Sequence, residues 1–156
     1  LPGRFEEIEL GVILDGAHNP DKIKALIKWL TAYSTQHTAV SGKQSAISLI
    51  LAFKKGKAWR RMVDLLIKNL YVKSVIATKF YATTDMGKYQ AVEPEEIAKY
   101  VKTVYRLQST VYSNSQEAVF EALQLTVNSQ LSTVIVTGSL YVVGEVRTMW
   151  KLSSFA

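Results

Sequence analysis

Hydrophobic and polar positions follow two periods along the chain, and these periods predict β-strands and α-helices in regular succession. Apolar runs of strand length occur at Val12–Leu14, Ala46–Phe53, Lys73–Phe80, Thr110–Tyr112 and Ser132–Thr137. After each run, apolar residues recur at the spacing expected of an amphipathic helix. The connections are long enough for right-handed crossovers, so we predict an α/β fold. Its centre should be a doubly wound, mostly parallel sheet with helices on both faces.

Polar residues mark where the predicted helices begin. Asn19 can cap a helix that has Pro20 at its first position, and Pro94 opens a later helix. Ser113–Gln116 has the spacing of a capping box, in which the first and last side chains bond to backbone amides. The apolar faces place the helices at Pro20–Tyr33, Trp59–Leu70, Pro94–Val104, a segment that ends near Val127, and Leu140–Trp150.

Three segments lack a clear helical period. Leu1–Leu10 should be an extended lead-in that forms an edge strand, and the polar segment Ser34–Gln44 should be a loop. Tyr81–Val92 contains Gly87 and follows a predicted strand. We expect it to be a mobile or functional loop at the ligand-facing end of that strand.

Composition narrows the class of protein. The chain has 156 residues, of which 48% are hydrophobic, so residues 1–156 can bury the core of one ordinary domain. The absence of cysteine excludes disulfides, thiolate nucleophiles and cysteine-ligated zinc, and it favours a cytoplasmic protein, with mitochondria as the alternative for a eukaryotic source. The apolar runs are shorter than the roughly 20 residues of a membrane span, so we expect no membrane partner. Because Leu1 is preceded by neither Met nor a leader, we expect a piece of a longer protein.

A formal net charge of +6 raises the question of an anionic partner. The densest group of Lys and Arg side chains, at Lys54–Arg61, surrounds Trp59. A solvated helix face explains this group, and we expect no nucleic-acid partner. The alternative is a docking surface for phosphates or for another polyanion.

Three common catalytic and nucleotide-binding motifs are absent from the sequence. Gly42-Lys43 and Gly56-Lys57 lack the upstream glycine and the following hydroxyl of a P-loop. Gly16 stands alone after its strand, where a dinucleotide fingerprint needs spaced glycines. Ser139 lacks the final glycine of the serine-hydrolase motif G-x-S-x-G. The chain therefore offers binding groups rather than a complete catalytic set.

Two predicted strand ends carry polar groups suited to binding. Asp15–Asn19 offers a carboxylate, an imidazole and a helix N-terminus, and Thr137–Ser139 offers hydroxyls and a second helix start. The carboxyl ends of parallel strands meet at the ligand crevice, so both segments should face one ligand. Together they suit an anion that also has hydroxyl and amino groups. Each also has a structural explanation, with Asp15 as a loop cap, His18 as a turn residue and Thr137–Ser139 as an ordinary turn.

Three motifs resemble the C-terminal domain of folylpolyglutamate synthase and dihydrofolate synthase, which belong to the Mur ligase superfamily. They are LPGRFE (Leu1–Glu6), LDGAHNP (Leu14–Pro20) and TGSLYVVGEVR (Thr137–Arg147), in the family's order. The resemblance implies a Rossmann-like domain of an ATP-dependent ligase that activates a carboxylate as an acyl phosphate and joins it to L-glutamate. It also implies a separate N-terminal ATPase domain that holds the P-loop and most contacts to ATP, Mg²⁺ and the pterin or folate substrate. The isolated C-terminal domain should then be inactive.

Carried over by position, the resemblance implies roles for four residues. Arg4 would be catalytic and would bind ATP by reaching across the domain cleft to the phosphates. Asp15 would face the nucleotide. His18 would be catalytic and would bind glutamate, and Ser139 would also contact glutamate. The resemblance implies no metal ligand in this chain.

The chain departs from the family at the turn after Ala46–Phe53. Many members have an Asp-Lys-Asp type of turn, where this chain reads Phe53-Lys54-Lys55-Gly56-Lys57, so an acidic role there is in doubt. The loop at Asp85–Tyr89 varies within the family, which leaves open whether the acceptor is dihydropteroate or a folate that is already glutamylated. The rival hypotheses are a Mur-type ligase for another amino acid and a non-catalytic module that binds anions or nucleic acid.

Overall fold

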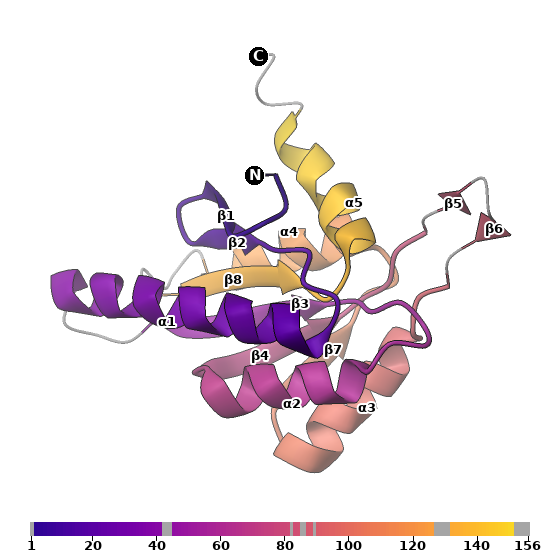
Figure 1. Cartoon of the computed structure of the whole chain (residues 1–156), viewed down its shortest axis with the longest axis horizontal. Coiled ribbons are helices and arrows are strands. Elements are labelled where there is room, and N and C mark those ends of the chain that lie inside the picture. The colour runs from indigo at the N-terminus through magenta and orange to yellow at the C-terminus, as the bar shows by residue number, and fades with distance from the viewer. Residues whose placement is uncertain are drawn as a thin grey trace.

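The computed structural model describes residues 2–41, 45–81, 83–84, 87–88, 90–126 and 132–151. A six-stranded sheet lies at the centre, with helices packed on its faces (Figure 1). The strands of this sheet are β1 (Glu6–Glu9), β2 (Val12–Leu14), β3 (Ala46–Leu51), β4 (Val72–Ala77), β7 (Gln108–Val111) and β8 (Ser132–Thr137). The helices are α1 (Pro20–Ser41), α2 (Trp59–Asn69), α3 (Pro94–Tyr105), α4 (Ser115–Thr126) and α5 (Leu140–Lys151).

The strand order in the sheet is β1-β2-β8-β3-β4-β7. β8 lies between β2 and β3 and pairs in parallel with both, with Val134 opposite Val12 on one side and opposite Ser48 on the other. β3, β4 and β7 continue the parallel pairing, and β1 runs antiparallel to β2. These pairings confirm the predicted α/β fold with a doubly wound, mostly parallel sheet, and the predicted edge strand in the lead-in.

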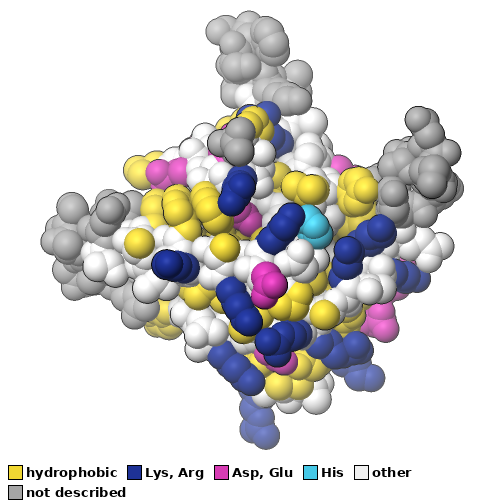
Figure 2. All heavy atoms as spheres, in the orientation of Figure 1, with side chains coloured by type: hydrophobic (Ala, Val, Ile, Leu, Met, Phe, Trp, Pro, Cys, Tyr) yellow, Lys and Arg dark blue, Asp and Glu magenta, His cyan; other side chains and the backbone are white. Residues whose placement is uncertain are grey.

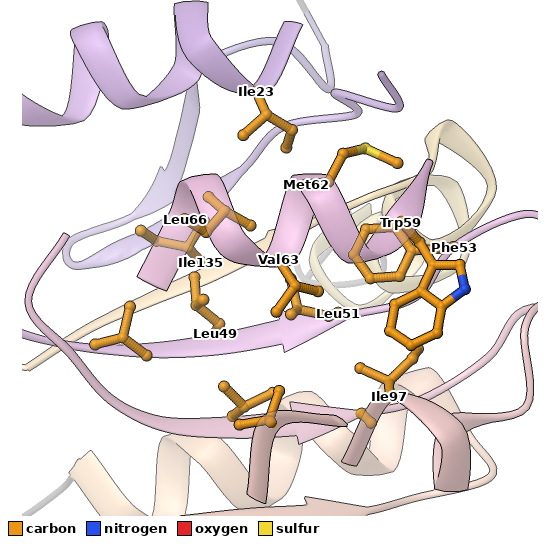
Figure 3. Close-up of a cluster of buried hydrophobic side chains, with 14 of the residues drawn as sticks. Ile23, Leu49, Leu51, Phe53, Trp59, Met62, Val63, Leu66, Ile97 and Ile135 are labelled. Carbon is orange, nitrogen blue, oxygen red and sulfur yellow. The ribbon is translucent and has the colours of Figure 1, made fainter. Parts of the chain in front are cut away.

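The two faces of the sheet are covered by different helices. Successive side chains of a strand point to opposite faces, so Leu49 and Leu51 join one buried cluster and Ile50 joins the other. The first cluster includes side chains of α1, α2 and α3, such as Ile23, Met62 and Ile97 (Figure 3). The second cluster includes apolar side chains of α4 and α5. Burial on both faces explains why the central strands read as continuous apolar runs.

The first helix is longer than its apolar stripe predicted. α1 extends to Ser41, so the prediction of a loop beginning at Ser34 was wrong for residues 34–41. Within this helix the hydroxyls of Thr31 and Thr35 donate to the carbonyl oxygens of Ile27 and Thr31, at 2.8 and 2.9 Å. Such bonds to the preceding turn allow polar residues to continue a helix without an apolar face.

Two further predictions need adjustment. Asn114, not Ser113, caps α4, because its Oδ1 accepts the amides of Gln116 and Glu117 at 2.9 and 3.0 Å. The predicted loop Tyr81–Val92 contains a short antiparallel pair, β5 (Thr83–Thr84) and β6 (Gly87–Lys88). The rest of the loop lies in part outside the described residues, and its predicted mobility is not tested. Among the described helices, none combines the length and the apolar character that crossing a bilayer requires.

Candidate functional site

The two polar strand ends lie side by side at the edge where the parallel strands end, which we call the carboxyl edge. The Asp15 amide donates to the Val136 carbonyl at 3.0 Å, and the Gly138 amide donates to the Ala17 carbonyl at 3.1 Å. These bonds join the exit of β2 to the exit of β8 because the two strands are neighbours in the sheet. The predicted meeting of the two motifs is therefore observed.

Residues 3–6, which we call the Arg4 turn, fold back onto the exit of β2. The Gly16 amide donates to the Gly3 carbonyl at 2.7 Å, and the Phe5 amide donates to Asp15 Oδ2 at 2.9 Å. Gly3 and Phe5 both have left-handed backbone angles, with φ of 74° and 48°. Such angles are uncommon for a residue with a side chain and persist where surrounding contacts hold them. The turn brings Arg4 to the same place as Asp15 and His18.

A cavity of about 180 Å³ opens at this junction. Arg4, His18 and Lys22 supply its cationic and polarisable groups, and Phe5 and Leu140 contribute apolar wall. The complete lining is Gly3, Arg4, Phe5, Asp15, Gly16, Ala17, His18, Lys22, Ala25 and Leu140. Figure 2 shows Lys and Arg side chains gathered around a histidine on one face of the molecule. The cavity therefore suits an anion with an apolar portion.

Asp15 is buried and holds two backbone segments of the site together. Its side chain is only 3% exposed, and its two carboxylate oxygens accept the amides of Phe5 and Ala17, each at 2.9 Å. Burial raises the pKa of Asp15, while these two amide bonds and the charges of Arg4 and Lys22 act in the opposite direction. A direct bond to a nucleotide would have to use the remaining lone pairs of the carboxylate. The predicted ATP contact of Asp15 stays a prediction.

His18 lines the cavity, and one of its ring nitrogens is bonded to the backbone. Its Nδ1 lies 3.0 Å from the Gly16 carbonyl, and because a carbonyl can only accept, Nδ1 carries the proton. The half-buried ring therefore keeps Nε2 for a ligand. Nε2 accepts a hydrogen bond when the ring is neutral and donates one when the ring is charged. Asn19 next to it caps α1, with its Oδ1 accepting the Lys22 amide at 2.8 Å.

Ser139 lies beside these groups but is enclosed. Its side chain is 2% exposed, and its Oγ accepts the Tyr141 amide at 3.0 Å at the start of α5. It does not line the cavity, although its neighbour Leu140 does. The neighbouring Gly138 has a φ of 108°, and a Cβ there would lie 2.3 Å from the Ala52 carbonyl oxygen. The predicted glutamate contact of Ser139 stays a prediction that would need this hydroxyl to be uncovered.

Lys22 and Leu140 line the cavity but were not among the predicted site residues. Lys22 follows the cap of α1 by three positions. Its place in the first helical turn after the polar loop was the available signal, because first-turn residues lie at the carboxyl edge. Leu140 is 57% exposed at the first position of α5, and no polarity pattern marks it.

The basic segment Lys54–Arg61 lies outside this cavity lining. The Arg60 guanidinium lies 4.3 Å from the Trp59 ring centroid and 5.8 Å from that of Tyr100. Lys55 Nζ donates to the Gln90 side chain at 3.3 Å. Trp59 is 7% exposed, so it cannot offer a face on which a nucleic-acid base could stack. These contacts remove the aromatic part of the nucleic-acid alternative.

Within the described part of the chain, no cluster of three or more His, Asp or Glu side chains is placed to hold a metal ion. Asp15, the buried carboxylate of the site, already accepts two backbone amides. Mg²⁺ prefers several oxygen ligands in octahedral geometry. The described residues therefore do not fit a resident magnesium site.

Known proteins of similar sequence are folate enzymes from two yeasts. The chain is 27% identical over 146 residues to dihydrofolate synthetase of Saccharomyces cerevisiae, covering 91% of this chain and 32% of that protein. It is 29% identical over 155 residues to the probable dihydrofolate synthetase of Schizosaccharomyces pombe, covering 97% of this chain and 34% of the relative. The chain thus spans about a third of the length of these relatives.

Solved structures of similar fold include two bacterial proteins. E. coli FolC in complex with ADP aligns with a TM-score of 0.74 at 17% identity, covering 100% of this chain and 33% of that one. Folylpolyglutamate synthase of Mycobacterium tuberculosis, complexed with ADP and AMPPCP, aligns with a TM-score of 0.72 at 21% identity, covering 96% and 32%. At these identities the alignments establish the fold. Residues 4–149 match the family described as the C-terminal domain of dihydrofolate synthetase, and the chain belongs to this family.

Proposed function

We propose that the chain is the C-terminal domain of an ATP-dependent folate-glutamate ligase. A separate N-terminal ATPase domain would hold the P-loop, Mg²⁺ and most of the pterin or folate site, and this chain alone would be inactive. The coverage of about a third of each relative supports this division. The observation that carries the proposal is the cavity at the carboxyl edge, where Arg4, His18 and Lys22 meet.

Arg4 would act on the phosphates of ATP. Its side chain is exposed at the cavity, so it can reach a nucleotide held by another domain. A guanidinium presents several donors in a fork that matches phosphate oxygens, and it stabilises charge on a phosphoryl group as that group moves. The N-terminus of α1, capped by Asn19, adds a positive potential on the same side.

His18 would bind the incoming glutamate. Because Nδ1 is committed to the Gly16 carbonyl, Nε2 is the atom that can donate to a carboxylate in the charged form of the ring. Lys22 lines the same cavity and would add a second cation for the acid groups of this substrate. Asp15 would hold the Arg4 turn and the loop before α1 in place for the nucleotide.

The relatives favour one of the two acceptors. Both yeast proteins carry the name dihydrofolate synthetase, and the matching family carries the same name. This supports dihydropteroate, the acceptor that receives a first glutamate, over a folate that is already glutamylated. The fold neighbours include folylpolyglutamate synthases, so acceptor choice needs a direct assay with both compounds.

The test of the proposal is Arg4→Ala in the complete enzyme, with Lys57→Ala as the matched control. Arg4→Ala should lower turnover by about 100-fold or more, because a charge-stabilising group is lost from the transition state. Thermal stability should not change, since the Arg4 side chain is exposed. Lys57→Ala, which removes a cation outside the cavity lining, should leave turnover at the level of the unmodified enzyme. Equal turnover in all three proteins would remove Arg4 from the mechanism.

His18→Ala tests the glutamate role separately. We expect the KM for glutamate to rise by about 10-fold or more, because a hydrogen bond to a charged group is lost. The KM for ATP should change less. An unaltered glutamate dependence would return His18 to a structural role.

A further inference from the structure

The side chain of Arg4 has little direct support in the structure. It is exposed, and the contact described for its guanidinium is with the Phe5 ring, whose centroid lies 5.6 Å away. The place of the guanidinium therefore depends on the backbone of the Arg4 turn. Whatever fixes that backbone also fixes Arg4.

The backbone of the Arg4 turn is held from two sides. On one side, the Gly3 carbonyl accepts the Gly16 amide at 2.7 Å and Asp15 accepts the Phe5 amide at 2.9 Å. On the other side, the Gly3 amide donates to Glu6 Oε1 at 3.1 Å. The left-handed φ of Phe5, 48°, is a conformation that the turn would leave if these bonds were lost.

Glu6 is itself fixed by the last helix. Arg147 of α5 donates through Nε to Glu6 Oε1 at 3.1 Å and through a terminal guanidinium nitrogen to Oε2 at 3.0 Å. This is the two-bond geometry that gives an arginine and a carboxylate a defined orientation. The side chain of Glu6 is 21% exposed and that of Arg147 is 28% exposed, so the pair is partly shielded from solvent. The Arg147 bonds also lower the pKa of Glu6, which keeps it charged at neutral pH.

We propose that Glu6 and Arg147 are positioning residues, which set the Arg4 turn so that the Arg4 guanidinium meets the phosphates of the bound nucleotide. The inference rests on the proposed function, because it assigns a purpose to the same cavity. Arg147 of α5 bonds to the carboxylate of Glu6, and this carboxylate accepts the amide of Gly3, the residue next to Arg4. α5 also supplies Leu140 to the cavity wall, so the same helix fixes both sides of the site.

Glu7 provides the matched control. It lies next to Glu6 on β1 and also accepts hydrogen bonds across elements, from the Tyr33 hydroxyl and from the Gly11 amide. None of the bonds described for Glu7 goes to the Arg4 turn. If Glu6 only fastened β1 to the domain, then Glu6→Ala and Glu7→Ala should behave alike.

The experiment measures turnover, KM for ATP and melting temperature for both variants of the complete enzyme. Glu6→Ala should lower turnover by about tenfold or more, because displacement of a catalytic group by about 1 Å can cost up to about 100-fold in rate. Glu7→Ala should keep turnover within about twofold of the unmodified enzyme, since residues outside the contact network of a site couple weakly to it. Glu6→Gln, which keeps an acceptor for the Gly3 amide, should fall between Glu6→Ala and the unmodified enzyme.

The double variant Arg4→Ala with Glu6→Ala decides the mechanism. If Glu6 acts through Arg4, the double variant should turn over no more slowly than Arg4→Ala alone, because groups that act as a unit are not additive. Multiplied losses in the double variant, or equal losses in Glu6→Ala and Glu7→Ala, would overturn the inference. These outcomes leave the proposed function intact. That function fails instead if the unmodified enzyme does not join glutamate to a pteroate or folate acceptor with ATP.

Discussion

Two pairs of parallel strands end at the carboxyl edge, and their polar residues differ in burial. We call the carboxyl end of a strand its exit; the first pair is β2 and β8, and the second is β3 and β4. At the first pair of exits, Asp15 and Ser139 are almost fully buried and accept backbone amides. At the second pair, the basic segment Lys54–Arg61 carries more charge, but its lysines are largely exposed. The cavity lies at the first pair. Charge density along the sequence is therefore a poorer guide to this site than the enclosure of a few polar groups.

The difference has an energetic reason. A cation in water interacts weakly with a partner, since the high dielectric constant screens it. The buried groups of the site, Asp15 and Ser139, are screened less, and their hydrogen bonds to backbone amides hold them in one orientation. In the basic segment, Arg60 lies over the Trp59 ring at 4.3 Å and Lys55 donates to Gln90. Near the carboxyl ends of β2 and β8, Arg4 lies farther from its ring partner, at 5.6 Å from the Phe5 centroid, and the hydrogen bond described for the His18 ring uses Nδ1.

The strongest test of this difference compares alanine substitutions at one glycine from each region, Gly138 after β8 and Gly56 in the basic segment. Gly138→Ala should lower the free energy of unfolding by about 3 kcal/mol or more, because clash and backbone strain combine. Its new Cβ would lie 2.3 Å from the Ala52 carbonyl oxygen, at a φ of 108°. Gly56→Ala in the basic segment has a φ of 85° but no atom within 4 Å of the new Cβ. It should cost only about 1 kcal/mol. Urea unfolding of both variants checks the ranking, which equal losses would contradict.

A second test uses the packing between the exit of β2 and α5. Gly16→Ala would place a Cβ 2.3 Å from Leu140 Cδ2, the end of a flexible side chain. We expect a loss of about 1–3 kcal/mol from overpacking. Leu140→Ala in the same protein should recover part of that loss, because it removes the atom that clashes. If the two substitutions were simply additive in urea unfolding, Gly16 and Leu140 would not be coupled as described.

A third test concerns pH and the Glu6–Arg147 pair. The pKa of Glu6 is lowered in the folded protein from its ordinary value of 4.5, mainly by the Arg147 bonds. A carboxylate with a lowered pKa stabilises the fold above its ordinary pKa, and this contribution is lost as pH falls through the folded pKa. The stability advantage of the unmodified chain over Glu6→Gln should therefore shrink below pH 4.5. We expect it to be about 1 kcal/mol at neutral pH, since the pair is partly exposed.

Asp15 should shift stability with pH in the opposite direction. Its pKa is raised by burial, so the folded chain binds a proton more readily than the unfolded chain does. Protonation of Asp15 therefore favours the fold as pH falls, and it offsets part of the loss from Glu6. The stability of Glu6→Gln relative to the double variant Glu6→Gln with Asp15→Asn should therefore increase as pH falls from neutral, in melting curves of both proteins. A difference that decreases as pH falls would contradict the assignment.

The smallest expected effect is at the basic segment. Lys57→Ala should change the free energy of unfolding by less than about 0.5 kcal/mol, as is usual for an exposed side chain without buried contacts. A larger loss in thermal or urea unfolding would show that the segment contributes to the fold. The contrast with the exits of β2 and β8 would then be weaker than the structure indicates.

The order of strands and helices could be predicted because it depends on local periodicity, which is present in the sequence. The end of α1 could not, since Ser34–Ser41 lacks an apolar stripe and is stabilised by bonds within the helix. The cap of α4 was misplaced by one residue because Ser113 and Asn114 are both good caps, and backbone geometry chooses between them.

The site was predicted in part for a similar reason. That the segments containing Asp15, His18 and Ser139 approach one another follows from the parallel sheet, which sequence patterns reveal. That Asp15 accepts the Phe5 amide depends on the Arg4 turn folding back. This is a contact between distant parts of the chain, which no local pattern encodes. The cavity position of Lys22, in contrast, could have been inferred from its place in the first turn of α1.

The position of β8 in the middle of the sheet governs when the site can exist. β8 must insert between β2 and β3. Both of these strands precede β8 by many residues in the sequence. Strand pairings between residues far apart in sequence form late, because the chain loses the conformational entropy of closing the long loop before the contact contributes any stability. A growing chain on the ribosome would therefore carry Arg4, Asp15 and His18 long before the cavity that they line could form, which requires that synthesis has passed β8.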